Sequence, residues 1–181
     1  MKNKVNHAFM FALEAHQGQF RKDGKPYISH PFSVAMILAQ NGACEDLICA
    51  GLLHDVIEDT EIKGDRIEKE FGSEVLRLIM FDTEDKDKTW LERKKQTLED
   101  LDNCDRDCAM LICADKLANI RDIEEIIDEF QENAWKYFKF GREYQEWLYR
   151  QYLDKLSRLS NLNMYKELKQ KVDIIFTNKG E

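Results

Sequence analysis

The chain has 181 residues, of which 43% are apolar and 34% charged, which suits one soluble globular domain with a proper core. Its formal net charge of −8 argues against a nucleic-acid-binding surface. No uncharged run approaches the length of a membrane span, and the amphipathic N-terminal segment is not a signal peptide. We therefore expect a cytoplasmic protein that binds neither nucleic acid nor membrane.

The cysteine content indicates neither a disulfide framework nor a thiolate zinc site. The count is odd, and no two cysteines stand in a CxxC spacing. Most of them fall beside apolar residues on predicted helices, so we interpret them as reduced core thiols, which fits a cytosolic protein. The five are Cys44, Cys49, Cys104, Cys108 and Cys113.

Apolar residues recur at helical spacing almost throughout the chain, beginning with a first helix around residues 5–13. A loop rich in glycine and basic residues follows. The only two prolines, Pro26 and Pro31, lie near the N-terminus, and the second helix is predicted to open at Pro31 and to close at Asn41–Gly42. Further helices are predicted at residues 45–55, 65–71, 73–81, 89–102, 108–123, 142–159 and 163–177.

Three features organise these later helices. Ser73 is predicted to cap the helix that follows it, and residues 82–88 are predicted to form a charged loop. Residues 108–123 are apolar on nearly every side as far as Asp115, which places this helix at the centre of the fold. Repeats, linkers and breaks in composition are missing from the sequence, so we predict one all-α domain over residues 1–181, completed by the helices within 142–177.

Residues from three places in the chain have the chemistry of metal ligands: His30, the pair His54–Asp55 and Asp115. Each alone has an ordinary interpretation as a cap or as a paired side chain. Burying ionised carboxylates, however, costs several kcal/mol each unless a partner compensates them. Two imidazoles and two carboxylates form a mixed N/O site, which suits Mn²⁺, Fe²⁺ or Zn²⁺ better than Ca²⁺ or Mg²⁺. An octahedral ion with these ligands keeps positions for water and a phosphate oxygen.

The order His…His-Asp…Asp resembles the pattern of the HD-domain metal-dependent phosphohydrolases. The stretches AHQGQFRKDGKPYISHP, GLLHDVIEDT and ADKLANIRD more closely resemble the hydrolase domains of RelA/SpoT-type proteins and small stand-alone alarmone hydrolases, and the resemblance covers residues 5–123. It implies a single HD-domain helical bundle and removal of the 3′-diphosphate from guanosine tetra- or pentaphosphate. It also implies one Mn²⁺ held by His30, His54, Asp55 and Asp115.

Two further acids follow the His-Asp pair. Glu58 lies one helical turn after His54, and Asp59 lies one turn after Asp55, so both can line the same cleft. The resemblance implies that these two carboxylates position or activate the attacking water. The alternative is a solvated helix end.

The candidate substrate contacts are basic and amide side chains. Arg21 and Lys22 lie on the loop before His30, and such a cluster suits phosphates in an acidic chain. Asn119 lies one turn after Asp115. The resemblance implies that the basic pair holds a small-molecule nucleotide and that Asn119 contacts its sugar. The alternatives are an ordinary basic loop and a buried amide bonded to backbone.

The remaining histidines and the tryptophans are interpreted as structural. We assign His7 and His16 to packing, with His16 a candidate support for the metal ligands. Trp90, Trp135 and Trp147 are interpreted as core residues rather than base-stacking platforms.

Two positions depart from the pattern of the alarmone hydrolases. Ile112 stands where lysine is usual, and Ala118 where histidine or an aromatic residue is frequent. The alternatives are therefore an HD phosphohydrolase acting on another nucleotide or phosphoester, and a non-catalytic nucleotide-binding HD protein. All the metal positions and both acids are present, which favours an enzyme.

Overall fold

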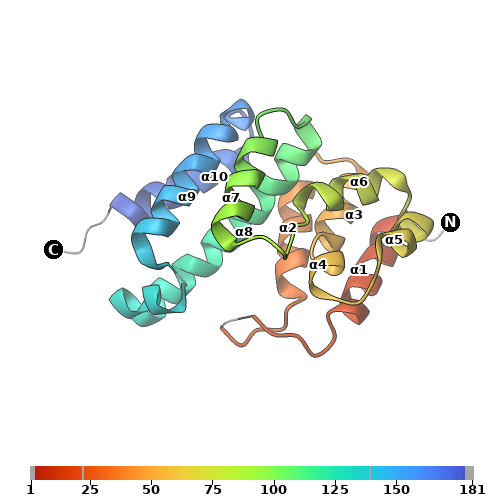
Figure 1. Cartoon of the computed structure of the whole chain (residues 1–181), viewed down its shortest axis with the longest axis horizontal. Helices are drawn as coiled ribbons and strands as arrows, with labels where there is room; N and C mark the ends of the chain where they lie inside the picture. The colour runs from red at the N-terminus through yellow and green to blue at the C-terminus, as the bar shows by residue number, and fades with distance from the viewer. Residues whose placement is uncertain (1–2, 22, 139, 178–181) are drawn as a thin grey trace.

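The structure, a computed structural model, describes residues 3–21, 23–138 and 140–177, and every regular element in these ranges is a helix (Figure 1). The prediction of an all-α fold is confirmed, whereas the single-domain boundary at 1–181 stays a prediction. The elements are α1 (Lys4–Ala15), α2 (Ser29–Gln40), α3 (Glu45–Leu53), α4 (Val56–Asp59), α5 (Gly64–Phe71), α6 (Ser73–Asp82), α7 (Trp90–Asp100), α8 (Arg106–Phe130), η1 (Gln131–Tyr137), α9 (Gly141–Lys155), η2 (Ser157–Leu159) and α10 (Asn163–Thr177).

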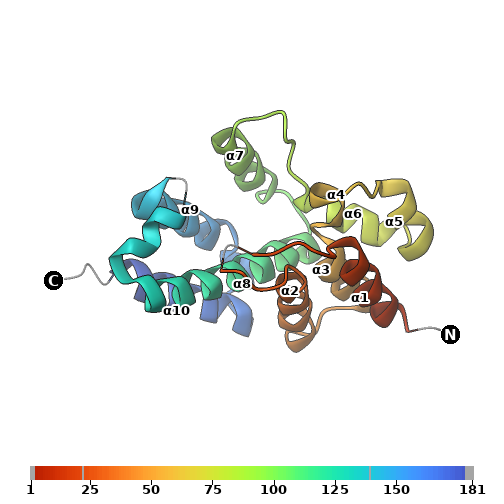
Figure 2. The same ribbon diagram turned by 90° about the horizontal axis from the view of Figure 1, so that it is seen from below.

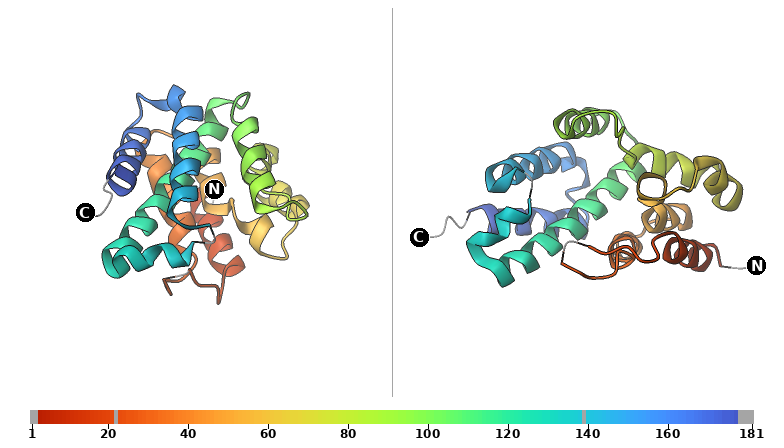
Figure 3. Two further views of the ribbon diagram at one scale, coloured as in Figure 1. Left: turned by 60° about the vertical axis from the view of Figure 1, so that its left-hand side comes forward. Right: turned by 60° about the horizontal axis from the view of Figure 1, so that its bottom comes forward.

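Helix α8 is the centre of the fold, as its apolar composition predicts. Its side chains are buried without interruption from Cys108 to Asp115, because α2, α3, α6 and α10 all pack against it (Figure 3). The helix starts sharply at Asp105, whose carboxylate accepts a hydrogen bond from the backbone N–H of Cys108 at 2.8 Å. A rigid central helix of this kind can hold a functional side chain such as Asp115 at a fixed depth.

Helices α2 and α3 cross at close range, and both lead to candidate ligands. The crossing depends on Gly51, where an added Cβ would stand 2.7 Å from Cδ1 of Leu38 and 3.4 Å from Cα of Ala35. His54 follows α3 immediately, and His30 lies in the first turn of α2. The absence of a side chain at Gly51 therefore lets the two histidines approach each other.

Helix α7 lies apart from most of the other helices, at the end of a long loop, and contacts α9 (Figure 2). Thr89 caps it through a reciprocal capping box, in which Thr89 accepts from the N–H of Glu92 and the Glu92 carboxylate accepts from the N–H of Thr89. The helix is thus formed by its own sequence, and its position is set by few partners.

Several boundaries differ from the predicted ones. Helix α2 opens at Ser29 rather than Pro31, because the N–H groups of Ser29 and His30 already donate to the carbonyls of Pro26 and Tyr27 at 3.1 and 3.0 Å. The prediction that Ser73 caps α6 is wrong. Gly72 takes the cap position with a φ of 90°, which reverses the chain after α5 and favours glycine.

The C-terminal half also departs from prediction in extent. Helix α8 continues to Phe130, and α9 ends at Lys155 before a short 3₁₀ turn. Within the ranges that the structure covers, helices long and apolar enough to cross a membrane are not found.

Candidate metal centre and active site

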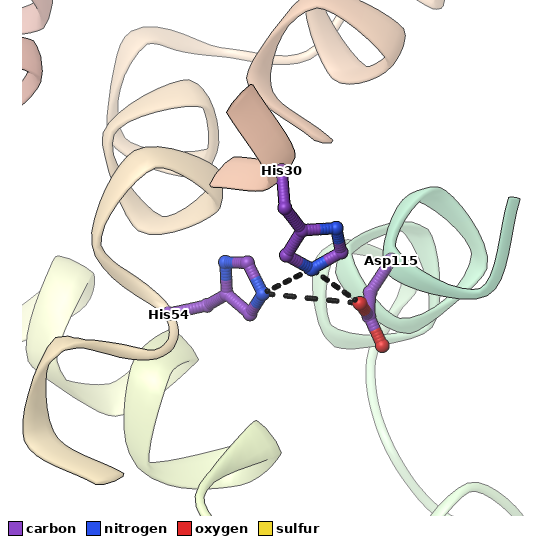
Figure 4. Close-up of side chains that lie close together, drawn as sticks. All are labelled: His30, His54 and Asp115. Carbon is purple, nitrogen blue, oxygen red and sulfur yellow. Dashed lines mark hydrogen bonds and ion pairs between the residues drawn. The ribbon is translucent and has the colours of Figure 1, made fainter. Parts of the chain in front are cut away.

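The side chains of His30, His54 and Asp115 meet in the interior, each from a different element (Figure 4). The Nε2 atoms of the two histidines are 3.3 Å apart. Oδ1 of Asp115 lies 3.1 Å from Nε2 of His30 and 3.8 Å from Nε2 of His54. The exposed fraction of these residues is 3–5%, so the cluster is buried.

Asp55 adds a second carboxylate beside this cluster. Its Oδ2 atom lies 3.2 Å from Nε2 of His54 and 3.8 Å from Nε2 of His30. The structure therefore brings together all four residues that the sequence predicts as metal ligands, although they are spread over 85 positions of the chain (30 to 115).

The hydrogen-bonding state of the imidazoles fits a metal ion. Nδ1 of His54 lies 2.9 Å from the carbonyl oxygen of Gly51, which can only accept, so Nδ1 carries the proton and Nε2 offers its lone pair in the neutral ring. That lone pair faces Nε2 of His30 and the carboxylates. Donors standing at ~2.1 Å from a shared ion are separated by about 3 Å when they are neighbours in an octahedron. The separations of 3.1–3.8 Å are compatible with such an ion.

The charged groups of the cluster interact strongly with one another. Burial lowers the pKa of His54, but the carboxylates of Asp55 and Asp115 outweigh it and raise the pKa to about 10. Although burial opposes it, Lys116 and the histidines hold the pKa of Asp115 well below its usual range. Burial and the charge of Asp115 raise the pKa of Asp82 to about 6. A divalent cation would neutralise these converging carboxylates.

Tyr27 connects a predicted ligand to a predicted catalytic acid. Its hydroxyl lies 2.7 Å from Oδ2 of Asp55 and 3.0 Å from Oδ2 of Asp59, so it can donate to either. Its ring stacks on His16 with centroids 4.7 Å apart, and Nδ1 of His16 lies 2.8 Å from Oε1 of Gln19. His16 therefore supports the site through Tyr27, as its sequence assignment allows.

Glu58 and Asp59 lie on α4, which directly follows His54 and Asp55, and both contact the loop before α7. The backbone N–H of Glu84 donates to Glu58 at 3.3 Å, and Lys86 lies 3.2 Å from Oδ1 of Asp59. Burial, with the neighbouring carboxylates of Glu84 and Asp59, raises the pKa of Glu58. A carboxyl with a raised pKa exchanges protons closer to neutral pH than an ordinary one.

A cavity of about 400 Å³ is lined by residues of the loop before α2 and of α7, α8 and α9, and Lys116 and Asn119 connect it to the metal cluster. Asn119 donates to Oδ1 of Asp115 at 2.7 Å, and Arg21 donates to the amide oxygen of Asn119 at 3.0 Å. Arg21 also pairs with Asp122. Arg21 and Asn119 both line the cavity, and their role as substrate contacts stays a prediction, while Lys22 lies outside the described residues.

Sequence reasoning missed the aromatic and basic side of this cavity. Trp90 is half-buried and packs against the core, as predicted, but it also lines the cavity together with Lys94. Trp147 is 37% exposed, so its assignment to the core is wrong, whereas Trp135 packs against the core. The spacing of Trp90 and Lys94 on one face of a helix was visible in the sequence, but nothing in it showed what that face meets.

The departures from the family pattern do not touch the cavity. Ile112 is fully buried and Ala118 is 3% exposed, and neither is among the described residues that line the cavity. Both belong to the packing of α8 against its neighbours.

Comparison with known proteins agrees with this geometry. The family model described as "HD domain" matches residues 8–138. The MESH1 proteins of Danio rerio and Homo sapiens, named guanosine-3′,5′-bis(diphosphate) 3′-pyrophosphohydrolases, are each 38% identical over 141 residues, which cover 76% of this chain and 76% of each relative.

Two solved structures are similar over most of the chain. A crystal structure of a Listeria monocytogenes protein has a TM-score of 0.77 at 33% identity, and the match covers 82% of this chain and 99% of that one. The structure of a metazoan orthologue of SpoT that hydrolyses ppGpp has a TM-score of 0.79 at 28% identity, and the match covers 99% of this chain and 97% of that one. The resemblance found in the motifs is confirmed. Together with the buried cluster, the family match indicates a divalent metal site, and the chain belongs to the HD-domain family.

Proposed function

We propose that this chain is a Mn²⁺-dependent hydrolase that removes the 3′-diphosphate from guanosine 3′,5′-bis(diphosphate). The observation that carries the proposal is the convergence of His30, His54, Asp55 and Asp115 beside a cavity of about 400 Å³. The names of the MESH1 relatives support this substrate. The free state of all five cysteines is consistent with action in the cytoplasm.

The four donors would hold the ion, and their mixed imidazole and carboxylate character favours Mn²⁺, with Fe²⁺ or Zn²⁺ as alternatives. When bound, a divalent ion of this kind polarises a phosphate oxygen and lowers the pKa of a coordinated water. In the reaction, water attacks the phosphorus bonded to the ribose 3′ oxygen. The bond between that phosphorus and the 3′ oxygen breaks, the 3′ oxygen takes up a proton, and pyrophosphate leaves.

Glu58 and Asp59 serve the attacking water in this proposal. The raised pKa of Glu58 suits it to accept the proton of the water. Asp59, fixed by the hydroxyl of Tyr27 and the ammonium of Lys86, orients the water by accepting its second hydrogen. These roles rest on the position of α4 directly after His54 and Asp55 and on the contacts of Tyr27 with both Asp55 and Asp59.

Arg21, Lys22 and Asn119 are assigned to the nucleotide. Asn119 is oriented beside the metal cluster by its bonds to Asp115 and Arg21, and we assign it to the ribose attached to the reacting phosphate. Arg21 lies 5.8 Å from the ring centroid of Tyr27 and presents a planar cation to the cavity. A planar guanidinium can stack on a base as well as bind phosphate.

The test is a screen for phosphate and pyrophosphate release by the purified protein over a panel of nucleotides, with Mn²⁺ and with chelator. Pyrophosphate released from guanosine 3′,5′-bis(diphosphate) only with metal, and lost in Asp115→Ala, supports the proposal. Release from a different phosphoester alone assigns the site to another HD phosphohydrolase reaction. Nucleotide binding without turnover identifies a non-catalytic binding protein.

A further inference from the structure

The cations that line the cavity differ in how far they are neutralised. Among the described lining residues they are Arg21, Lys94 and Lys116. Arg21 has the carboxylate of Asp122 as a partner, and Lys116 has that of Asp115 at 2.5 Å. These two pairs contribute no net charge to the cavity wall.

On α7 the balance is different. Oε1 of Glu84 lies 2.5 Å from Nζ of Lys94, and Oε2 of the same carboxylate lies 3.2 Å from Arg93. Two cations therefore share one carboxylate, so this group of three side chains carries a charge of +1. The Nε atom of Arg93 is buried and has no hydrogen-bond partner among the described residues. Lys94 is among the described residues that line the cavity and Arg93 is not, so Lys94 is the cation that an anion in the cavity can reach.

The surroundings strengthen that charge. The Nζ atom of Lys94 lies 5.8 Å from the ring centroid of Trp90, and the Trp90 ring packs on Phe140 and Tyr144 with centroids 4.7 and 5.2 Å away. The Lys94 side chain is only 17% exposed. An aromatic wall that excludes water reduces the screening of a neighbouring ammonium.

We propose that Lys94 forms an anion subsite on α7 that binds the 5′-diphosphate of the substrate, while Arg93 holds the carboxylate of Glu84. The inference rests on the proposed function, in which the 3′-diphosphate occupies the metal end of the cavity beside Asn119. The substrate carries a second diphosphate on the other side of the same ribose. Since α7 bounds the cavity across from the loop that carries Arg21, the excess charge on α7 faces that second group.

Lys94 can exchange its contact with Glu84 for a contact with the ligand. When a phosphate binds Nζ of Lys94, the carboxylate of Glu84 keeps its contact with Arg93, so it is not left without a cationic partner. An ammonium that exchanges a carboxylate for a phosphate pays a smaller desolvation free energy than an ammonium that is transferred from bulk water. The subsite therefore needs no rearrangement of α7.

The test compares Lys94→Gln with the matched control Lys95→Gln, which makes the same charge change on an exposed position of the same helix. Two substrates are used, guanosine 3′,5′-bis(diphosphate) and guanosine 3′-diphosphate. Lys94→Gln is expected to raise KM for the first by about tenfold or more, as for loss of a charged hydrogen bond, and to leave KM for the second unchanged. Lys95→Gln is expected to change neither.

An equal effect of Lys94→Gln on both substrates, or no effect, overturns the subsite. A wild-type protein that hydrolyses neither substrate refutes the proposed function, and the subsite is then decided by binding. Calorimetry with guanosine 5′-diphosphate should show affinity at least tenfold weaker in Lys94→Gln than in wild type or Lys95→Gln. Equal affinity in all three proteins overturns the subsite independently of activity.

Discussion

The hydroxyl of Tyr27 contacts a predicted metal ligand, Asp55, and a predicted catalytic acid, Asp59, at once. Burial and the two carboxylates raise the pKa of Tyr27 above its usual value, so the hydroxyl keeps its proton and remains a donor. Partners of this kind fix the orientation of a ligand, and their loss typically weakens metal binding by about 10–100-fold.

Tyr27→Phe should therefore weaken Mn²⁺ binding by roughly 10–100-fold while keeping the ring stacked on His16. Calorimetric titration of the metal-free protein measures the affinity. Tyr165→Phe is the matched control, since its hydroxyl donates to the carbonyl of Leu153 far from the cluster. Unchanged affinity in Tyr27→Phe would show that Asp55 is positioned by the backbone alone.

Glu58 should act as a base only when it is ionised, so its raised pKa sets the pH below which catalysis by this carboxylate is lost. As pH falls through that pKa, Glu58 takes up a proton and the rate should drop, at a pH above the ordinary range for glutamate. Glu58→Gln should lower kcat by ~10²–10⁴-fold, abolish this acid limb and retain the metal. Metal analysis and pH–rate profiles check both points. Loss of metal in Glu58→Gln would make Glu58 a ligand instead.

The residues that sequence reasoning identified and those it missed differ in kind. His30, His54, Asp55 and Asp115 stand in recognisable motifs, and their meeting in the interior follows from those motifs. Tyr27 lies inside the first of these motifs, but the motif does not indicate what its hydroxyl contacts. Its role depends on a loop that turns back on itself, with an isolated bridge between Phe20 and Pro26, and loop geometry of this kind is not encoded in a periodic pattern.

At the scale of elements, the crossing of α2 and α3 determines whether the histidines meet. Gly51→Ala would place a methyl group 2.7 Å from Cδ1 of Leu38, a side chain with no exposed surface. Overpacking of this kind costs about 1–3 kcal/mol, which for a chain of this size lowers Tm by roughly 2–12 °C. Thermal unfolding measures the shift.

The double variant Gly51→Ala with Leu38→Ala provides the control. Because removing the Leu38 side chain opens the space that the new methyl group needs, the combined loss should be smaller than the sum of the two single losses. Strict additivity would mean that the two side chains do not compete for the same space.

Helix positions were predictable where hydrophobic periodicity is strong, as in α8, whose central place follows from its composition alone. The ends of helices were less predictable. Helix α8 ends at Phe130, its C-cap residue Gln131 adopts a φ of 51° without being a glycine, and the 3₁₀ segment Gln131–Tyr137 follows. Helix α7 and its charged face could be predicted from the sequence. Its contribution to the cavity wall could not, because that wall also depends on α9, which lies about 50 residues later.

The acidic net charge of the protein and the buried metal cluster both favour a bound divalent cation. The net charge of −8 repels a polyanionic substrate at long range but attracts a divalent cation. The four donors come from α2, the α3–α4 junction and α8, so an ion bound by them joins elements that lie far apart in sequence. Metal binding should therefore stabilise the whole fold and not only the site.

At a free Mn²⁺ concentration of 100 times Kd, binding to the native state adds about 2.7 kcal/mol to the free energy of unfolding, or a rise in Tm of roughly 5–10 °C for a chain of this size.

The same binding should release a proton near pH 7, because the pKa of His54 is about 10 without metal and a ligating imidazole must be neutral. The apparent affinity should thus rise with pH, by up to tenfold per unit while His54 starts protonated. Thermal unfolding with and without Mn²⁺, and calorimetry in buffers of different ionisation enthalpy, measure the two effects. Asp115→Ala should show neither, and a wild-type protein that binds Mn²⁺ with no proton released would place the bound ion away from His54.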